Sequence, residues 1–331
     1  DDINNGCVSA FIKKNIGTTL STGELFEPEP LHNTLLLIQV VAQHVRKKWQ
    51  TEHNVLFLEQ RCWMSVLSSY SKPLGISIVP ISCIFNLKPT LSLIKVRLRG
   101  KPIAYMILHC LKNYCIPSLK DMAKPLKYFN STHSMILVDN ILSKYNASSF
   151  WNRSALPPEN ILFVSESYLI NKEQWDEIKN AGMDAVALKP WIAAGPSVPM
   201  FLPHIDKKED CHGYASRVCH SRERKFIKFH LDRFYYIKSY WLNLFRACNA
   251  KVYISQHKYS DKHIAVTEAI KELGGIAAIW QESYSEFSSP AGLVKADLVF
   301  GFSPSVADIE LGNGSEAPYF VTIGYIGDYR F

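Results

Sequence analysis

Short apolar runs alternate with helical patterns along the chain, and the clearest example begins at residue 251. Residues 251–255 are rich in β-branched and aromatic side chains, which is typical of a buried strand. Apolar residues recur at helical spacing over residues 261–273, and Gly274-Gly275 is a helix stop. Residues 276–280 form a second apolar run. This stretch predicts a β-α-β unit, which builds a parallel sheet through a right-handed crossover.

A second β-α-β unit is predicted nearer the middle of the chain. Residues 161–164 read as a strand, residues 172–180 as a helix closed by Gly182, and residues 184–188 as the next strand. Other apolar runs predict strands at 54–58, 76–81, 134–138, 296–300 and 319–323. Helical spacing predicts helices at 34–48, 62–70, 222–247 and 305–311.

Strands that alternate with helices in this way indicate an α/β fold. We expect a Rossmann-like, doubly wound, mostly parallel sheet, in one or two units. We divide the chain into a Rossmann-like region over residues 1–205 and a continuing α/β unit over residues 206–331. Residues from about 88 to 128 are basic and fit a helical insertion or helices packed on one side of the sheet.

The predicted helix at 222–247 carries eight aromatic residues. An aromatic stripe at helical spacing is typical of core packing, and a surface for stacking bases is the less favoured reading. The chain also lacks GxGxxG and GxxxxGK[ST], so the usual phosphate-binding loops are not predicted.

Composition narrows the class of partner. The net charge of +7 favours anionic partners, but the basic residues are scattered, so nucleic-acid binding is not expected. No apolar run approaches the roughly 20 residues of a membrane span. The eight cysteines form no CxxC, and the pairs Cys211-His212 and Cys219-His220 fit no standard zinc spacing. We therefore expect no metal, and because no signal peptide is visible we expect free thiols in a reducing cytoplasm.

Polar residues follow the predicted strands directly. Gln256, His257 and Lys258 follow the strand at 251–255, and Gln281, Glu282 and Ser283 follow the strand at 276–280. Ligands of open α/β sheets bind outside the carboxyl ends of the strands, so these triplets form a candidate site. The alternative is that the same residues cap helices or bond to one another in loops. By the same reasoning, Glu166 and Glu59 are further candidates.

Residues 250–331 resemble sugar-nucleotide enzymes of the GT-B fold. The resemblance rests on a strand with a polar end, a helix ending in Leu-Gly-Gly, a strand ending in Gln281-Glu282, the run ADLVF and the final VTIGY. Residues 150–190, with PPENILFVSES and a later AGM turn, are similar to bacterial surface-polysaccharide biosynthesis proteins of the glycosyltransferase kind. The triplet Gln281-Glu282-Ser283 departs from the Gln-His-Gly or Glu-Ala-Gly that these relatives often carry.

The resemblance implies an enzyme that transfers a sugar from a nucleotide-sugar donor to a glycan or lipid-linked acceptor, without a cofactor. It implies a cytoplasmic protein, with peripheral contact with the inner membrane as a further expectation. In such enzymes this order of elements closes the acceptor-side domain. We therefore expect the donor-binding domain to follow residue 331, and the present chain alone to transfer little or no sugar.

Sugar transfer needs a base or a nucleophile and a group that stabilises the leaving phosphate. Glu282 and Glu166 are the leading carboxylates, and His257 is a candidate base or phosphate partner. The predicted substrate-binding residues are Gln256, Lys258, Gln281, Ser283 and Glu59. Two alternatives stay open: a sugar-nucleotide epimerase or hydrolase, and a non-catalytic interaction module with a degenerate site.

Overall fold

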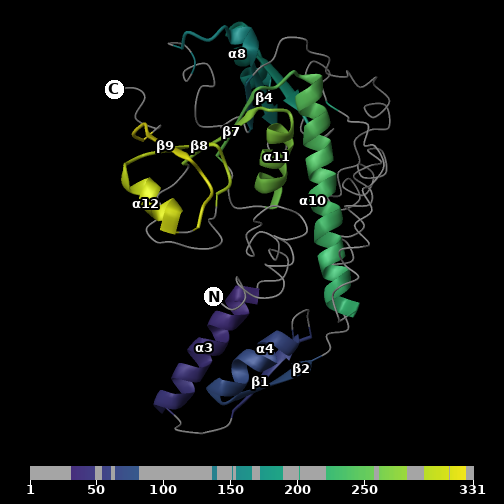
Figure 1. Ribbon diagram of the computed structural model, residues 1–331, viewed down its shortest axis with the longest axis vertical. Coiled ribbons are helices and arrows are strands. Elements are labelled where there is room, and N and C mark those ends of the chain that lie inside the picture. The colour runs from purple at the N-terminus through teal and green to yellow at the C-terminus, as the bar shows by residue number, and fades with distance from the viewer. Residues whose placement is uncertain are drawn as a thin grey trace. The chain divides into compact units, whose positions relative to one another are not determined.

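The computed structural model describes twelve parts of the chain, drawn as ribbons in Figure 1. These parts are residues 31–48, 54–60, 64–81, 136–139, 151, 154–165, 172–188, 201, 221–256, 261–281, 294–312 and 314–325. The expected helical insertion at about 88–128 lies outside them. Contacts divide the chain into two compact units: residues 1–95 with 209–233, and residues 96–208 with 234–331.

The described residues of the first unit form a small parallel sheet, two α-helices, a short 3-10 helix and residues 221–233 of a long helix that continues into the second unit. Its elements are α3 (Leu31–Lys48), β1 (Asn54–Glu59), α4 (Met64–Ser71), the short 3-10 helix η1 (Lys72–Leu74) and β2 (Ile76–Ile81). β1 and β2 pair in parallel, from Asn54 opposite Ile76 to Glu59 opposite Ile81. The strands and helices predicted here are confirmed, although α3 begins three residues earlier than the spacing indicates.

Alternation of side chains explains how this small sheet packs. Leu58 on β1 and Ile76 on β2 are buried, as is Leu67 on α4, the helix that connects the strands. Val55 and Phe57 are exposed on the same strand, because successive side chains of a strand point to opposite faces. Pro80 lies within β2 opposite Leu58. Within the described residues β2 pairs on one side alone, so the missing N–H of Pro80 interrupts no ladder there.

The second unit contains a seven-stranded sheet in which every pair is parallel. Its strands are β3 (Ile136–Asp139), β4 (Ile161–Ser165), β5 (Asp184–Ala187), β6 (Val252–Ser255), β7 (Ile276–Trp280), β8 (Leu298–Gly301) and β9 (Tyr319–Thr322). The described helices among them are η3 (Pro158–Asn160), α8 (Lys172–Asn180), α10 (Ser221–Ala247), α11 (Asp261–Glu272) and α12 (Ser305–Gly312). Both predicted β-α-β units are confirmed. α10 extends across the division between the two units.

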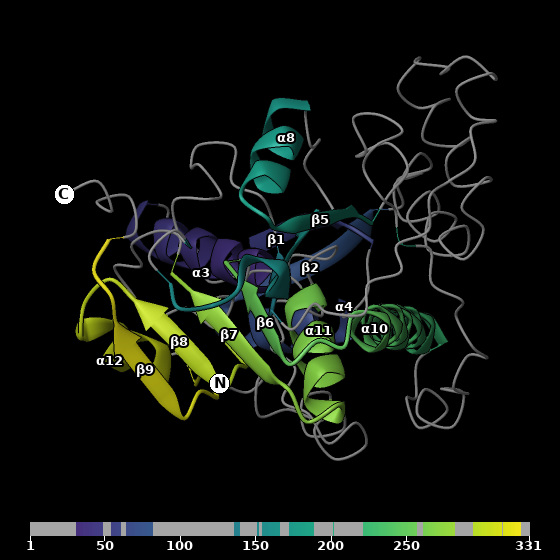
Figure 2. The same ribbon diagram turned by 90° about the horizontal axis from the view of Figure 1, so that it is seen from above.

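The strand order is β5-β4-β3-β6-β7-β8-β9. β3 is therefore the first strand of this sheet along the chain. The chain adds β4 and β5 on one side of β3 and then returns to add β6 to β9 on the other side. Right-handed crossovers in two opposite directions place their helices on opposite faces. Figure 2 shows α8 on one side of the sheet and α10 with α11 on the other. This is a doubly wound sheet of the Rossmann-like kind, as the alternation of elements predicts.

Each face of the sheet has its own core. All five residues of β4 are buried, and Ile161 and Phe163 pack with Ile178 of α8. On the other face, the ring of Trp241 in α10 lies 5.4 Å from that of Tyr253 in β6. Phe245 lies 5.6 Å from the same tyrosine ring. Phe234, Trp241 and Phe245 of α10 are thus core residues, and these three support the packing interpretation of the helix.

Four of the described α-helices end in the same way before the chain enters a strand. Residues in the left-handed conformation follow α8, α10, α11 and α12; they are Gly182, Asn249, Gly274 and Gly314. After α11, the N–H of Gly274 bonds the carbonyl of Lys271 and the N–H of Gly275 bonds that of Ile270. This pair of bonds is the Schellman motif, and it satisfies carbonyls that the helix end leaves open. The Gly274-Gly275 stop is therefore confirmed.

The α/β class with parallel sheets is confirmed. The GT-B arrangement, the division at residues 205 and 206, and the donor domain beyond residue 331 stay predictions.

Candidate functional site

The strand order reverses between β3 and β6, because the chain leaves β3 toward β4 and leaves β6 toward β7. Ligands of doubly wound sheets bind at such a switch point, outside the carboxyl ends of the strands. Asp139 is the last residue of β3. Ser255 ends β6 and is followed by Gln256. All three residues are buried, with at most 2% of their surface exposed.

The described residues supply hydrogen-bond partners to one carboxylate oxygen of Asp139 and none to the other. The hydroxyl of Tyr253 donates to Oδ2 at 2.7 Å, and Nζ of Lys262 lies 2.8 Å from the same atom. Oδ1 is also buried, but no donor in the described part of the chain reaches it. A buried carboxylate oxygen without a hydrogen bond is unfavourable, so this atom has unused capacity to accept one.

Lys262 is the second residue of α11 and supplies the positive charge beside Asp139. Its Nζ also lies 4.6 Å from the centre of the Trp241 ring, a cation–π arrangement. The side chain of Lys262 is 18% exposed, whereas that of Asp139 is 1% exposed. The ammonium group therefore compensates a carboxylate that is almost completely removed from water.

Gln256 and Gln281 follow neighbouring strands, since β6 and β7 pair in parallel. Gln256 and Gln281, both predicted from the sequence as site residues, thus lie at the same edge of the sheet. Their contacts differ: Oε1 of Gln281 accepts the N–H of Phe302 at 2.8 Å. Oε1 of Gln256 is buried, and no donor from the described residues reaches it.

Gln281 therefore has a structural role, which is to connect two neighbouring strands. Its backbone N–H bonds the carbonyl of Phe300 at 2.9 Å, and its side chain bonds the N–H of Phe302. The residue joins the end of β7 to the end of β8, as the structural alternative for these polar residues anticipates. Its predicted part in substrate binding stays a prediction.

The other predicted site residues are placed as follows. Glu59 is the last residue of β1 and belongs to the small sheet of the first unit, so it is not at the edge that carries Gln256 and Gln281. Five predicted residues lie outside the described residues: Glu166, His257, Lys258, Glu282 and Ser283. Their proposed roles stay predictions.

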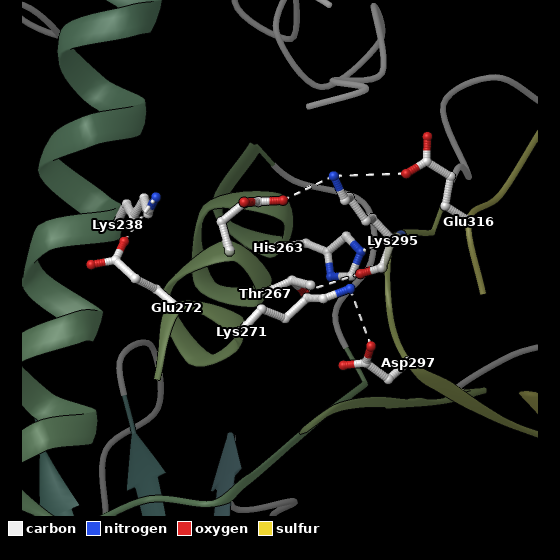
Figure 3. A network of polar contacts seen from close by, with 9 residues as sticks. Lys238, His263, Thr267, Lys271, Glu272, Lys295, Asp297 and Glu316 are labelled. Atoms are coloured by element: carbon white, nitrogen blue, oxygen red, sulfur yellow. Dashed lines mark hydrogen bonds and ion pairs between the residues drawn. The ribbon is translucent and has the colours of Figure 1, made fainter. Parts of the chain in front are cut away.

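A polar network fastens α11 to the segment that leads into β8 (Figure 3). Thr267 donates through its hydroxyl to the carbonyl of Lys295 at 3.0 Å, and the N–H of Lys295 donates to Nε2 of His263 at 3.0 Å. Nζ of Lys295 lies 2.8 Å from Glu268 and 3.7 Å from Glu316. These groups bond to one another and to the backbone, so the network holds elements together.

Further ion pairs extend the same network. Lys271 lies 3.1 Å from Oδ1 of Asp297, whose Oδ2 accepts the N–H of Ala277 at 2.9 Å. Lys238 of α10 lies 3.1 Å from Glu272 at the end of α11 (Figure 3). Both oxygens of Asp297 have partners, which sets this carboxylate apart from Asp139.

Asp139 was not among the residues predicted from the sequence. The same rule that selected Glu59, Glu166 and Glu282, a carboxylate at the end of an apolar strand, applies equally to Asp139. Asp139 differs from those residues because its strand, β3, lies where the strand order reverses. The strand order cannot be read from the sequence.

Two further properties bear on function. The described residues contain no group of three or more His, Cys, Asp or Glu side chains arranged to hold a metal ion. Among the same residues, no helix combines the length and the apolar character needed to cross a membrane. Comparison with protein-family models, with curated proteins and with solved structures finds no match to this chain.

Proposed function

We propose that the chain is a glycosyltransferase, or the acceptor-side domain of one, that acts on a nucleotide-sugar donor and a glycan or lipid-linked acceptor. One observation supports the proposal most: a doubly wound parallel sheet whose carboxyl edge carries Asp139, Gln256 and Gln281 around the reversal of strand order. Enzymes with such sheets bind their substrates at this edge. The choice of sugar transfer rests on the resemblance of residues 150–190 and 250–331.

The proposed chemistry assigns the proton transfer to residues that follow the strands. A base removes the proton of the acceptor hydroxyl as that oxygen attacks the anomeric carbon, and the nucleotide leaves with the bonding electron pair. Glu282 and Glu166 are the proposed carboxylates, and His257 is the proposed base or phosphate partner. Lys258 would offset the charge that develops on the leaving phosphate.

The test is a screen of nucleotide-sugars against the full gene product, followed by a transfer assay. Release of nucleoside diphosphate is measured with and without a membrane extract that supplies glycan and lipid-linked acceptors. We expect release that depends on the acceptor and falls by about 100-fold or more in Glu282→Gln, because general bases contribute on that order. Glu316→Gln, which removes an exposed carboxylate of the α11 network, is the matched control and should retain full activity.

Other outcomes would favour the alternatives. Turnover of the nucleotide-sugar without any acceptor would replace transfer with an epimerase or a hydrolase. Absence of nucleotide-sugar binding, together with unchanged cellular function after alanine substitution of Glu166, His257 and Glu282, would replace catalysis with an interaction role.

A further inference from the structure

We propose that Asp139 and Gln256 form a subsite that binds the hydroxyl groups of a sugar at the β3–β6 switch point, with Lys262 as a positioning residue. The assignment of the ligand as a sugar rests on the proposed function. The location rests on the structure of the sheet alone: β3 and β6 are neighbours, Asp139 ends β3, and Gln256 directly follows the last residue of β6.

The main support is a pair of buried oxygen atoms without donors. Asp139 Oδ1 and Gln256 Oε1 are both buried and lack a hydrogen-bond partner within the described residues. The residues are 1% and 2% exposed. Leaving such an atom unbonded is unfavourable, and more so for a charged group, so native proteins rarely tolerate it without a reason. Two such oxygen atoms lie at the ends of adjacent strands, at the switch point where doubly wound sheets bind ligands. We take them to indicate a ligand that supplies hydrogen-bond donors.

The chemistry of the two atoms defines the ligand group. An ionised carboxylate oxygen and an amide oxygen accept hydrogen bonds and donate none, so the ligand must present O–H or N–H groups. Two positive charges disfavour a ligand ammonium group at this place. Nζ of Lys262 already lies 2.8 Å from Oδ2 of Asp139, and Lys262 is the second residue of the 12-residue helix α11, whose N-terminus carries the positive end of the helix dipole. Neutral donors remain, and the hydroxyls of a sugar ring supply several in a small volume.

Lys262 determines which oxygen of Asp139 stays open. Its ammonium group and the Tyr253 hydroxyl both contact Oδ2, which leaves Oδ1 for another donor. The ammonium group is held in turn over the Trp241 ring. Lys262 is therefore assigned no contact with the sugar; it fixes the orientation of the carboxylate that makes the contact.

The experiment measures glycoside binding by saturation-transfer NMR. The probes are the methyl glycosides of glucose, galactose, mannose, N-acetylglucosamine and rhamnose, with UDP as a probe without a hexose. We expect at least one glycoside to bind the wild-type chain, and its Kd to rise about tenfold or more in both Asp139→Asn and Gln256→Ala. UDP binding, where present, should change less than glycoside binding.

Asp297→Asn is the matched control, because it also removes a carboxylate charge without changing the shape of the side chain. Asp297 already has partners on both oxygens, and its substitution should leave glycoside binding unchanged. Thermal unfolding of each variant identifies any loss of fold. Should Asp139→Asn not fold, Gln256→Ala carries the test, since it introduces no change beside Lys262.

Three results would overturn the subsite: no glycoside binds the wild type, both variants bind as the wild type does, or a crystal soaked with saturating glycoside shows fixed water alone on both oxygens. The same preparations separate this inference from the proposed function. Glycoside binding by the chain, without any nucleotide-sugar turnover by the full gene product, supports the subsite and rejects the transferase. Turnover with glycoside binding unchanged in both variants supports the transferase and rejects the subsite.

Discussion

Lys262 shows how much can depend on one side chain of a helix that packs beside the central strands of the sheet. It is the cation beside an almost fully buried carboxylate, and it also contacts the aromatic core of α10. Burying two charges is expensive, so such a pair adds little stability compared with apolar residues of the same size. Removing one partner is a different matter, because the remaining charge is then buried alone.

We therefore expect Lys262→Met to lower the free energy of unfolding by about 3 kcal/mol. The double variant Lys262→Met with Asp139→Asn should lose less than Lys262→Met alone, since no uncompensated charge then remains. Urea unfolding followed by circular dichroism measures both. A loss in the single variant below about 1 kcal/mol, the level of exposed ion pairs, would show that Asp139 is well compensated without Lys262.

A second single residue, Cys248, makes the free energy of unfolding depend on pH. The thiol is fully buried, and this burial raises its pKa from the ordinary value of 9.0 to about 12. The folded state therefore holds the proton more tightly than the unfolded state. The resulting stability is complete below pH 9 and is lost as the pH rises from 9 toward 12, by at most about 1.4 kcal/mol per pH unit.

The measurement compares urea unfolding of the wild type and Cys248→Ala between pH 7 and pH 11. Lysine and tyrosine side chains titrate in both proteins, so the difference between the two curves isolates the thiol. We expect the wild type to lose stability relative to the variant above pH 9. Parallel curves over the whole range would mean that the thiol ionises as easily in the folded chain as in the unfolded chain.

At the scale of the elements, the local sequence largely determines where helices and strands begin and end. Strand β7 and helix α8 occupy the ranges that hydrophobic spacing predicts. The reason is that their boundaries coincide with strong local signals, such as Gly182 and Gly274 in the left-handed conformation. Where such a signal is weak, the boundary shifts: α3 begins at Leu31, three residues before the start that the apolar spacing predicts.

The helix ends therefore provide a test of the local signal. Gly274 has φ of +69°, and no atom lies within 4 Å of a Cβ built there. Gly274→Ala should then cost about 1–2 kcal/mol of unfolding free energy through backbone conformation alone. Asn249 occupies the equivalent position after α10, with φ of 49°. Asn249→Gly should be neutral or slightly stabilising, and equal losses in both variants would contradict this account.

At the scale of the whole molecule, sequence predicts the class of the sheet but not the order of its strands. Alternation of strands and helices indicates parallel pairing, because the crossover connections require it. It does not say that β3 lies between β4 and β6, since the β3–β6 pair joins residues more than one hundred positions apart, such as Val138 and Ile254. The importance of Asp139 follows from that order, which is why the strand-end rule did not select it.

The two sheets should also differ in local stability. β4 and β6 pair on both sides within the seven-stranded sheet, whereas β1 and β2 pair with each other alone among the described strands. We expect backbone amides of β1 to exchange with deuterium about 100-fold faster than those of β4, because fewer bonds and less buried apolar area hold the smaller sheet. Mass spectrometry of peptic peptides measures this. Equal protection of the two strands would indicate cooperative unfolding of the chain as one body.

The position of Lys262 over the Trp241 ring has an optical consequence. Indole emission responds to the electric field along the ring, and an ammonium group 4.6 Å from the ring centre contributes strongly to that field. The same ammonium group is tied to the Asp139 carboxylate. A molecule that donates a hydrogen bond to Oδ1 of Asp139, the oxygen that no described residue contacts, weakens the attraction between this carboxylate and Lys262 and thereby shifts the emission wavelength of Trp241. The fold thus contains its own spectroscopic indicator of occupancy at the centre of the sheet.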